Sequence, residues 1–164
     1  MHRLRCSVLF IFLGLTQVIY SLPSDRQKPV DVRSDSAQIH HFTRTGVYRG
    51  HVIATQGTTQ LTADQVIAKL DADNQLQSLV ALGTPDKPAT FATIPHVHDQ
   101  AVVAHAQKIA YTPANHQVRL SENAWVAHEK DSYHAQLIDY DTLTQSVQTP
   151  GSAGGVTIVI NPKS

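Results

Sequence analysis

The stretch GHVIATQGTTQLTADQVIA, residues 50–68, carries the pattern that decides the fold. Apolar side chains recur at every second position, in Val52 and Ala54 and again in Leu61 and Ala63. Such alternation is typical of a β-strand with one buried face, because successive side chains of a strand point to opposite sides. Further alternating sets follow along the chain: Val30 and Val32, Ile109 and Tyr111, Ile138 and Tyr140, and Val156, Ile158 and Ile160. The chain from Val30 onward is therefore predicted to consist of strands.

Turn-forming residues separate these runs at short intervals. They lie at 71–74, 84–86, 112–115, 121–123, 129–131 and 150–151. Only residues 101–108 have helical propensity, and the alternation that continues through Ile109 and Tyr111 outweighs it. Many short strands at a spacing of about 8–12 residues predict an all-β sandwich, barrel or roll.

A repeat of strand, turn and strand emerges when Ile39, Ile67, Ile109 and Ile138 are placed in register. The four segments then read SAQI, DQVI, AQKI and AQLI. The interval from Ile67 to Ile109 is the longest of the three and contains an inserted hairpin or loop at 87–100. Because one hairpin buries only one face, several must stack before the chain is stable. The repeat predicts an elongated, layered antiparallel roll with these isoleucines facing its inside.

The N-terminal segment 1–21 has the pattern of a secretory signal peptide. Residues 1–5 are basic, residues 7–20 form an apolar run, and Ser21 is a small residue before the helix-breaking Pro23. The run is shorter than the roughly 20 apolar residues that a membrane-spanning helix needs. The alternative is an uncleaved anchor, because residues 19–21 form an imperfect cleavage site. We predict a signal peptide over 1–21 and a single exported β domain over 22–164.

Composition excludes several classes of function. The 164 residues include 41% hydrophobic and 16% charged side chains, which is typical of one ordinary globular domain. Without Arg3 and Arg5 of the predicted leader, the chain has 11 basic and 13 acidic side chains. No basic patch for nucleic acid is therefore expected. The one cysteine, Cys6, also lies in the leader. The predicted mature chain therefore has neither a disulfide nor a thiol nucleophile.

The histidines and carboxylates do not form a recognisable catalytic or metal site. His96 and His98 lie in a proline-interrupted insert with only Asp99 close by, whereas structural zinc needs four rigidly spaced ligands. The glycine-rich stretch 151–155 has the spacing of neither a nucleophile elbow nor a phosphate loop. We predict no catalytic residue, metal or cofactor. One alternative is a secreted glycan-binding or glycan-cleaving β-roll that uses His96, His98 or the acidic turns.

Five segments, in order, resemble one known family. They are KPVDVRSDSAQI at 28–39, GHVIATQGTTQLTADQVIA at 50–68, GTPDKPATF at 83–91, HAQKIAY at 105–111 and ENAWVA at 122–127. Together they resemble the periplasmic lipopolysaccharide-transport bridge proteins of the LptA/OstA family, over residues 28–160. Two positions depart from the family pattern. Glu122 stands where a glycine is usual, and Pro113 follows Tyr111 where a strand residue is expected.

The resemblance implies a fold and a function. The expected fold is an OstA-like antiparallel β-jellyroll, open along one side, whose apolar inside holds the acyl chains of lipopolysaccharide. Rolls of this kind stack head to tail in the periplasm. They meet an inner-membrane-anchored bridge partner at the N-terminal edge and an outer-membrane assembly protein at the C-terminal edge, so self-association is also expected. A membrane-anchored relative of the same transport system is the alternative.

Alternation and resemblance together name the site residues. The side chains expected to line the lipid groove are Val30, Val32, Ile39, Val52, Leu61, Ile67, Phe91, Ile109, Tyr111, Ile138 and Tyr140. The residues expected in partner-binding edge strands are Val30, Asp31 and Val32, and Val156, Thr157, Ile158, Val159 and Ile160. Judged from the residues alone, the same apolar set fits a tightly packed core equally well. Pro29 and Pro162 likewise fit protected edges as well as open ones.

Overall fold

The computed structural model describes residues 28–94, 99–151 and 154–161. The predicted signal peptide at 1–21 lies outside these residues, as do His96, His98 and the middle of the glycine-rich stretch. The described residues contain no helix that is long and apolar enough to cross a membrane.

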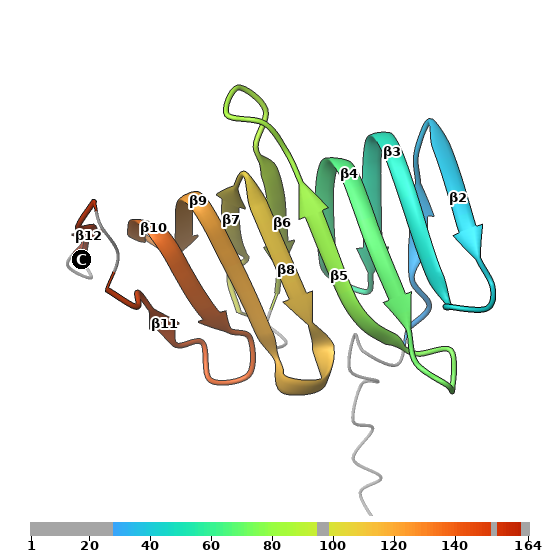
Figure 1. The fold of residues 1–164 in the computed structure, drawn as a ribbon. Coiled ribbons are helices and arrows are strands. Elements are labelled where there is room, and N and C mark those ends of the chain that lie inside the picture. The colour runs from blue at the N-terminus through green and yellow to red at the C-terminus, as the bar shows by residue number, and fades with distance from the viewer. Residues whose placement is uncertain (1–27, 95–98, 152–153, 162–164) are drawn as a thin grey trace, which may run out of the picture.

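In the described part of the chain, twelve antiparallel strands form one continuous sheet, which confirms the all-β prediction (Figure 1). The strands are β1 (Asp31–Arg33), β2 (Ser36–His40), β3 (Thr45–Gln56), β4 (Thr59–Leu70), β5 (Leu76–Leu82), β6 (Ala89–Thr93), β7 (Val102–Ala106), β8 (Lys108–Thr112), β9 (Gln117–His128), β10 (Asp131–Asp141), β11 (Val147–Gln148) and β12 (Val156–Val159). Residues 102–106 form β7 and residues 108–112 form β8, which confirms that the helical propensity of 101–108 is outweighed. Pro113 ends β8 and begins a short 3-10 helix, η2 (Pro113–Asn115), so the departure from the family pattern at Pro113 marks a turn.

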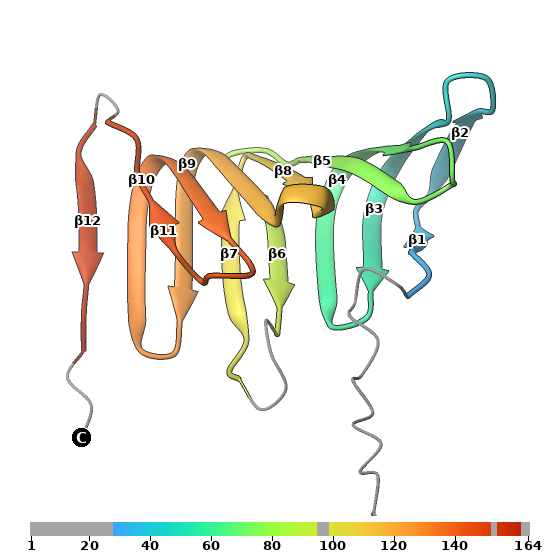
Figure 2. The ribbon, with the colours of Figure 1, turned by 90° about the horizontal axis from the view of Figure 1, so that it is seen from below.

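The sheet folds into two layers because its four longest strands belong to both. In β3, residues 45–49 pair with β2, whereas residues 53–55 pair with β1. The strands β4, β9 and β10 are divided in the same way. We call the layer that contains β2, β5, β8 and β11 the β5 layer, and the layer that contains β1, β6, β7 and β12 the β6 layer. Figure 1 shows the first layer side by side from β2 to β11, and Figure 2 shows the second from β1 to β12.

All described chain crossings between the two layers lie on one side of the roll. The long strands cross from one layer to the other near residues 50, 64, 122 and 136. The connections from β1 to β2, from β5 to β6 and from β7 to β8 lie on the same side. Two backbone hydrogen bonds tie these connections to the crossings: the amide of Asp35 donates to the carbonyl of Gly50, and the amide of Gln107 donates to the carbonyl of Glu122. On the opposite side, the described residues contain no crossing between the layers, and turns within one layer join β3 to β4, β4 to β5 and β8 to β9. The structure is therefore a jellyroll with a closed side and an open side, as the resemblance implied.

A β-bulge marks the crossing in each of two hairpins. The register of β3 and β4 shifts between Arg49 and Val52, where Gly50 and His51 have φ of 76° and 45°. The register of β9 and β10 shifts in the same way, and there Glu122 and Asn123 have φ of 68° and 55°. An extra residue in one strand bends the chain and raises its twist, which carries the strand from one layer to the other.

The two bulges belong to an internal repeat of the structure. When they are superimposed, Ala54 of β3 corresponds to Val126 of β9, and Val66 of β4 corresponds to Ile138 of β10. The predicted repeat of strand, turn and strand is therefore present. Its register differs from the isoleucine alignment, because Ile67 is not the counterpart of Ile138.

Candidate functional site

The inside of the roll is built from rows of side chains that run across all its strands. In the β6 layer, Leu61, Phe91, Ala104 and Val126 are paired from strand to strand and are at most 3% exposed. The row beside the closed side is made almost entirely of alanine. It contains Val52, Ala63, Ala89, Ala106, Ala124 and Ala135, all buried. Alternation thus supplies one continuous apolar inner surface.

The β5 layer contributes two further inner rows. The row nearer the closed side contains Tyr48, Val66, Ala81, Ile109, Leu120 and Ile138. The row nearer the open side contains Ile39, Gly46, Ala68, Leu79, Tyr111, Val118, Tyr140 and Val147. The two layers meet through Phe91 and Tyr111, whose ring centroids are 5.9 Å apart.

Most of the predicted groove residues lie on this inner surface. Seven of them are buried there: Val52, Leu61, Phe91, Ile109, Tyr111, Ile138 and Tyr140. Val30 and Val32 are half-buried at the N-terminal end, where Val32 packs against the core. Ile39 lies on the inner face of the edge strand β2, but no further strand covers it, so its side chain is 50% exposed.

The prediction for Ile67 was wrong, because its side chain lies on the outer face. Its neighbours Val66 and Ala68 are the buried inner residues, at 0% and 7% exposure. The β-bulge in this hairpin shifts the alternation by one residue, so Ala63 and Val66 both face inward. A slip of one position moves a strand's side chains to the other face. The structural counterpart of Ile138 is therefore Val66.

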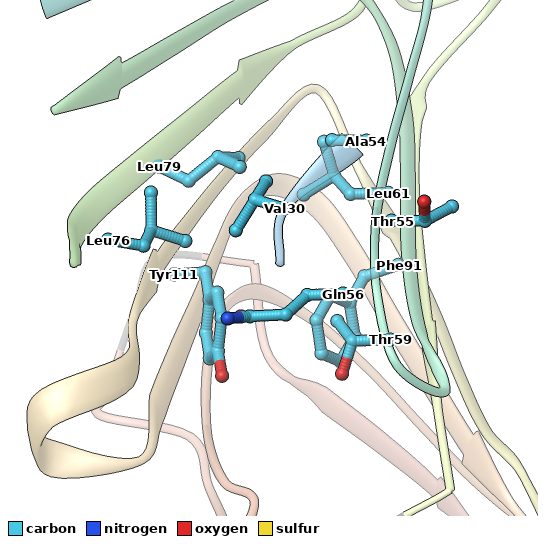
Figure 3. Close-up of a pocket in the computed structure, with 10 residues that line it drawn as sticks. All are labelled: Val30, Ala54, Thr55, Gln56, Thr59, Leu61, Leu76, Leu79, Phe91 and Tyr111. Carbon is cyan, nitrogen blue, oxygen red and sulfur yellow. The ribbon is translucent and has the colours of Figure 1, made fainter. Parts of the chain in front are cut away.

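An apolar pocket opens between the layers in the N-terminal half (Figure 3). Its volume is about 280 Å³, including the part open to solvent. The lining residues are Val30, Ala54, Thr55, Gln56, Thr59, Leu61, Leu76, Leu79, Phe91 and Tyr111. Leu79 was not among the predicted groove residues, although its alternation with Ala81 indicates a buried strand face.

Polar side chains gather along the open side of the β6 layer. Gln56 and Thr93 are only 8% and 6% exposed. The Nε2 atom of Gln56 donates to the carbonyl oxygen of Lys28 at 3.0 Å, and the hydroxyls of Thr59 and Thr93 are hydrogen-bonded at 2.9 Å. The inside of the roll is thus apolar at its closed side and partly polar at its opening. No sequence pattern had indicated these polar residues.

The two layers also touch across the opening in the C-terminal half. The Nε2 atom of Gln145, in the turn between β10 and β11, donates to Oδ2 of Asp99 at 2.8 Å. Asp99 precedes β7, in the connection that belongs to the other layer. Asp99 also acts on Tyr140. The pKa of Tyr140 is raised to about 12, first by burial and then by the nearby carboxylates of Asp141 and Asp99.

Each end of the sheet has two edge strands, one in each layer. At the N-terminal end they are β1 and β2, and β3 is the one described strand that pairs with either. At the C-terminal end they are β11 and β12, and β10 is the one described strand that pairs with either. The predicted edge residues 156–159 form β12, whereas Ile160 lies just beyond it and is 70% exposed. The strands β2 and β11 were not predicted as edges.

The described residues contain no group of side chains that could bind a metal ion. Within 28–94, 99–151 and 154–161, no group of three or more His, Cys, Asp and Glu side chains could hold a metal ion. Asp71, in the turn after β4, accepts backbone hydrogen bonds from Asp73 and Gln75, both at 2.9 Å. This acidic turn is therefore explained by local backbone geometry.

An open antiparallel jellyroll with an apolar inside is the class that these observations define. Comparisons with known proteins agree with it: the family described as "LptA/(LptD N-terminal domain) LPS transport protein" matches residues 31–146. The chain belongs to this family. It is 31% identical to the lipopolysaccharide export system protein LptH of Pseudomonas aeruginosa, over 96% of this chain and 95% of that protein.

Two further comparisons extend the result. The lipopolysaccharide export system protein LptA of Escherichia coli is 26% identical, over 87% of this chain and 76% of that protein. The crystal structure of LptH, described as a periplasmic component of the lipopolysaccharide transport device, superimposes with a TM-score of 0.76 at 31% identity. It covers 85% of this chain and 100% of the LptH chain. The similarity therefore includes both the sequence and the jellyroll architecture.

Proposed function

We propose that this protein carries lipopolysaccharide across the periplasm as one segment of a bridge, with the lipid's acyl chains held between the two layers. The observation that carries the proposal is the apolar inner surface of a jellyroll whose described chain crosses between the layers on one side only. Its membership of the lipopolysaccharide transport family supports the same conclusion.

The energetics require such a surface. Each methylene exposed to water costs about 0.8 kcal/mol, so a lipid with several acyl chains cannot cross an aqueous space unprotected. Rows of apolar side chains that run from β1 to β12 offer cover along the whole roll. The small alanines beside the closed side leave room for chains once the layers separate.

The ends of the roll are proposed to join its partners. Residues 30–32 at the N-terminal edge would pair with an inner-membrane-anchored partner, and residues 156–160 at the C-terminal edge with an outer-membrane assembly protein or a second copy. Edge strands have unpaired N–H and C=O groups that can accept another strand. Unlike ends that meet head to tail form open chains. The exposed Val156, Ile158 and Val159 add apolar surface to this edge.

Export by a cleaved signal peptide is part of the proposal. It is checked by sequencing the N-terminus of the protein recovered from the periplasm. A start shortly after Ser21 is expected, whereas an intact apolar run at 7–20 would favour the membrane-anchored alternative.

Site-specific photo-crosslinking tests the lipid groove. A photoreactive residue at Val32 or Phe91, both on the inner face, is expected to crosslink to lipopolysaccharide. The same residue at Arg33, on the outer face of β1, is the matched control and is expected to remain unlinked. Equal yields at all three positions, or none at any, would contradict the proposal.

A further inference from the structure

The hydroxyl of Tyr140 is the one buried side-chain polar atom without a hydrogen bond among the described residues. Tyr140 is only 2% exposed, on the inner face of β10. Burying a hydroxyl without a partner is unfavourable, and phenylalanine would fill the same volume without this penalty. A native structure with such an atom therefore needs an explanation, and a ligand group that arrives later is one.

The position of Tyr140 narrows the choice of ligand group. It belongs to the inner row nearest the opening, one residue before Asp141 and the turn to β11. The next row inward has Ile138, and the row at the closed side has Ala135, both at most 2% exposed. Polarity thus increases from the closed side to the opening. This gradient matches an amphiphile whose chain ends lie deep and whose polar end lies at the opening.

The chemistry of the phenol identifies what it would bind. The pKa of Tyr140 is raised to about 12, first by burial and then by the carboxylates of Asp141 and Asp99, so the hydroxyl keeps its proton at neutral pH. A protonated phenol can donate a hydrogen bond. The first polar atoms above an acyl chain are those of the ester or amide carbonyl that joins it to its headgroup, and a carbonyl accepts hydrogen bonds.

We propose that the Tyr140 hydroxyl donates a hydrogen bond to the carbonyl that links an acyl chain to its headgroup, which holds the chain at a defined depth in the roll. This inference rests on the proposed function and adds a polar subsite to it. The contact between Asp99 and Gln145 lies close to this subsite and joins the two layers across the opening, so a lipid that reaches Tyr140 from that side has to separate it.

The test compares two single-chain probes that differ only in the linkage. Palmitoyl lysophosphatidylcholine has an ester carbonyl, and its hexadecyl ether analogue has none. Each is titrated as monomer into the purified protein by calorimetry. For the ester probe, Tyr140→Phe is expected to weaken binding about fivefold, the loss of one hydrogen bond. For the ether probe, binding is expected to change by less than about twofold.

Tyr133→Phe is the matched control. Tyr133 lies on the same strand and on the inner face of the other layer, but it is only half-buried. Because the hydroxyl of Tyr133 does not belong to the proposed subsite, this variant is expected to show no difference between the ester and ether probes in the effect on binding. The melting temperature of Tyr140→Phe is expected to equal or exceed that of the unaltered protein, because the substitution removes an unpaired hydroxyl, so a loss of affinity cannot come from unfolding.

Three results would overturn the subsite: equal weakening for both probes, no weakening for either, or binding of lipopolysaccharide by a protein that binds neither probe. Failure of the proposed function is a separate result. It would be seen as an absence of lipopolysaccharide binding by the unaltered protein, while the difference between ester and ether probes would still decide the role of Tyr140.

Discussion

The two halves of the roll have the same backbone plan but different interiors. Residues 31–93 and 102–159 repeat the same order of strands, and β1, β3 and β4 of the first half correspond to β7, β9 and β10 of the second. Near the opening, the first half has Gly46 and Ala68 where the second half has Val118 and Tyr140. Leu79, the strand neighbour of Ala68, lines the pocket, and of the lining residues only Tyr111 comes from the second half. Because the two halves share a backbone plan, we attribute the open space in the first half to its smaller side chains near the opening.

The two bulges also share a backbone conformation but differ in the residue that adopts it. In the first half, the first of the two left-handed positions is Gly50, and a Cβ there would overlap the carboxylate of Asp35. In the second half, the equivalent residue is Glu122, which adopts φ of 68° despite its side chain. The crossing between layers thus imposes a left-handed backbone whatever residue is present. For a residue other than glycine, asparagine or aspartate, this backbone costs roughly 1–2 kcal/mol.

The largest expected effect is on the free energy of unfolding, and it compares an isoleucine on the inner face of the second half with one on the outer face of the first half. Ile138→Ala removes a fully buried side chain and is expected to lower the free energy of unfolding by about 3–4 kcal/mol. Ile67→Ala, on the outer face, is expected to lower it by about 1 kcal/mol. Urea unfolding of both variants measures the difference. Equal losses would mean that Ile67 faces the core and that the isoleucine alignment is correct.

The next effect tests the bulge of the first half. Gly50→Ala places a Cβ against Asp35 in a left-handed backbone, so a loss of about 2–3 kcal/mol of unfolding free energy is expected. Gly151→Ala is the matched control, since nothing lies within 4 Å of the added Cβ. Its unfolding free energy is expected to change by less than about 0.5 kcal/mol. A tolerant Gly50 would show that the two bulges are not equivalent.

The next effect is specific to the second half, because Tyr140 is ionisable and its counterpart in the first half, Ala68, is not. The pKa of Tyr140 is raised in the folded state to about 12, so its contribution to stability is complete below pH 10 and is lost as the pH rises toward 12. Between about pH 9 and about pH 11.5, the unaltered protein is expected to lose about 2 kcal/mol more than Tyr140→Phe. Urea unfolding at the two pH values measures this difference. Parallel losses in both proteins would contradict the shifted pKa.

The smallest effect concerns the bulge of the second half. Glu122→Gly makes this bulge resemble the first and is expected to raise the unfolding free energy by about 0.5–1 kcal/mol, because glycine adopts the left-handed backbone without strain. Asn123→Gly is the control. Asparagine already tolerates φ of 55°, so that variant is expected to show no gain. A destabilised Glu122→Gly would mean that the glutamate side chain makes a contact worth more than the strain.

Much of the fold and part of the candidate site could be predicted from the sequence. Alternation in Val52 and Ala54 and in Ile109 and Tyr111 indicated both the strands and their inner faces. The bulges could not be predicted, because a one-residue shift such as that between Ala63 and Val66 leaves the apolar composition of the strand unchanged. For the same reason Ile67 was assigned to the wrong face.

The sequence by itself determined that this chain forms antiparallel strands with one apolar face, and it identified the family through five ordered segments. Period-two alternation and turn residues are local properties of the chain, so they can be recognised without knowing its tertiary contacts. Only the tertiary structure decided which strands cross between layers, that Gln56 and Thr93 lie at the opening, and that the Tyr140 hydroxyl is buried without a partner. These features depend on contacts between residues far apart in the chain, and the burial of a side chain is decided by what packs over it.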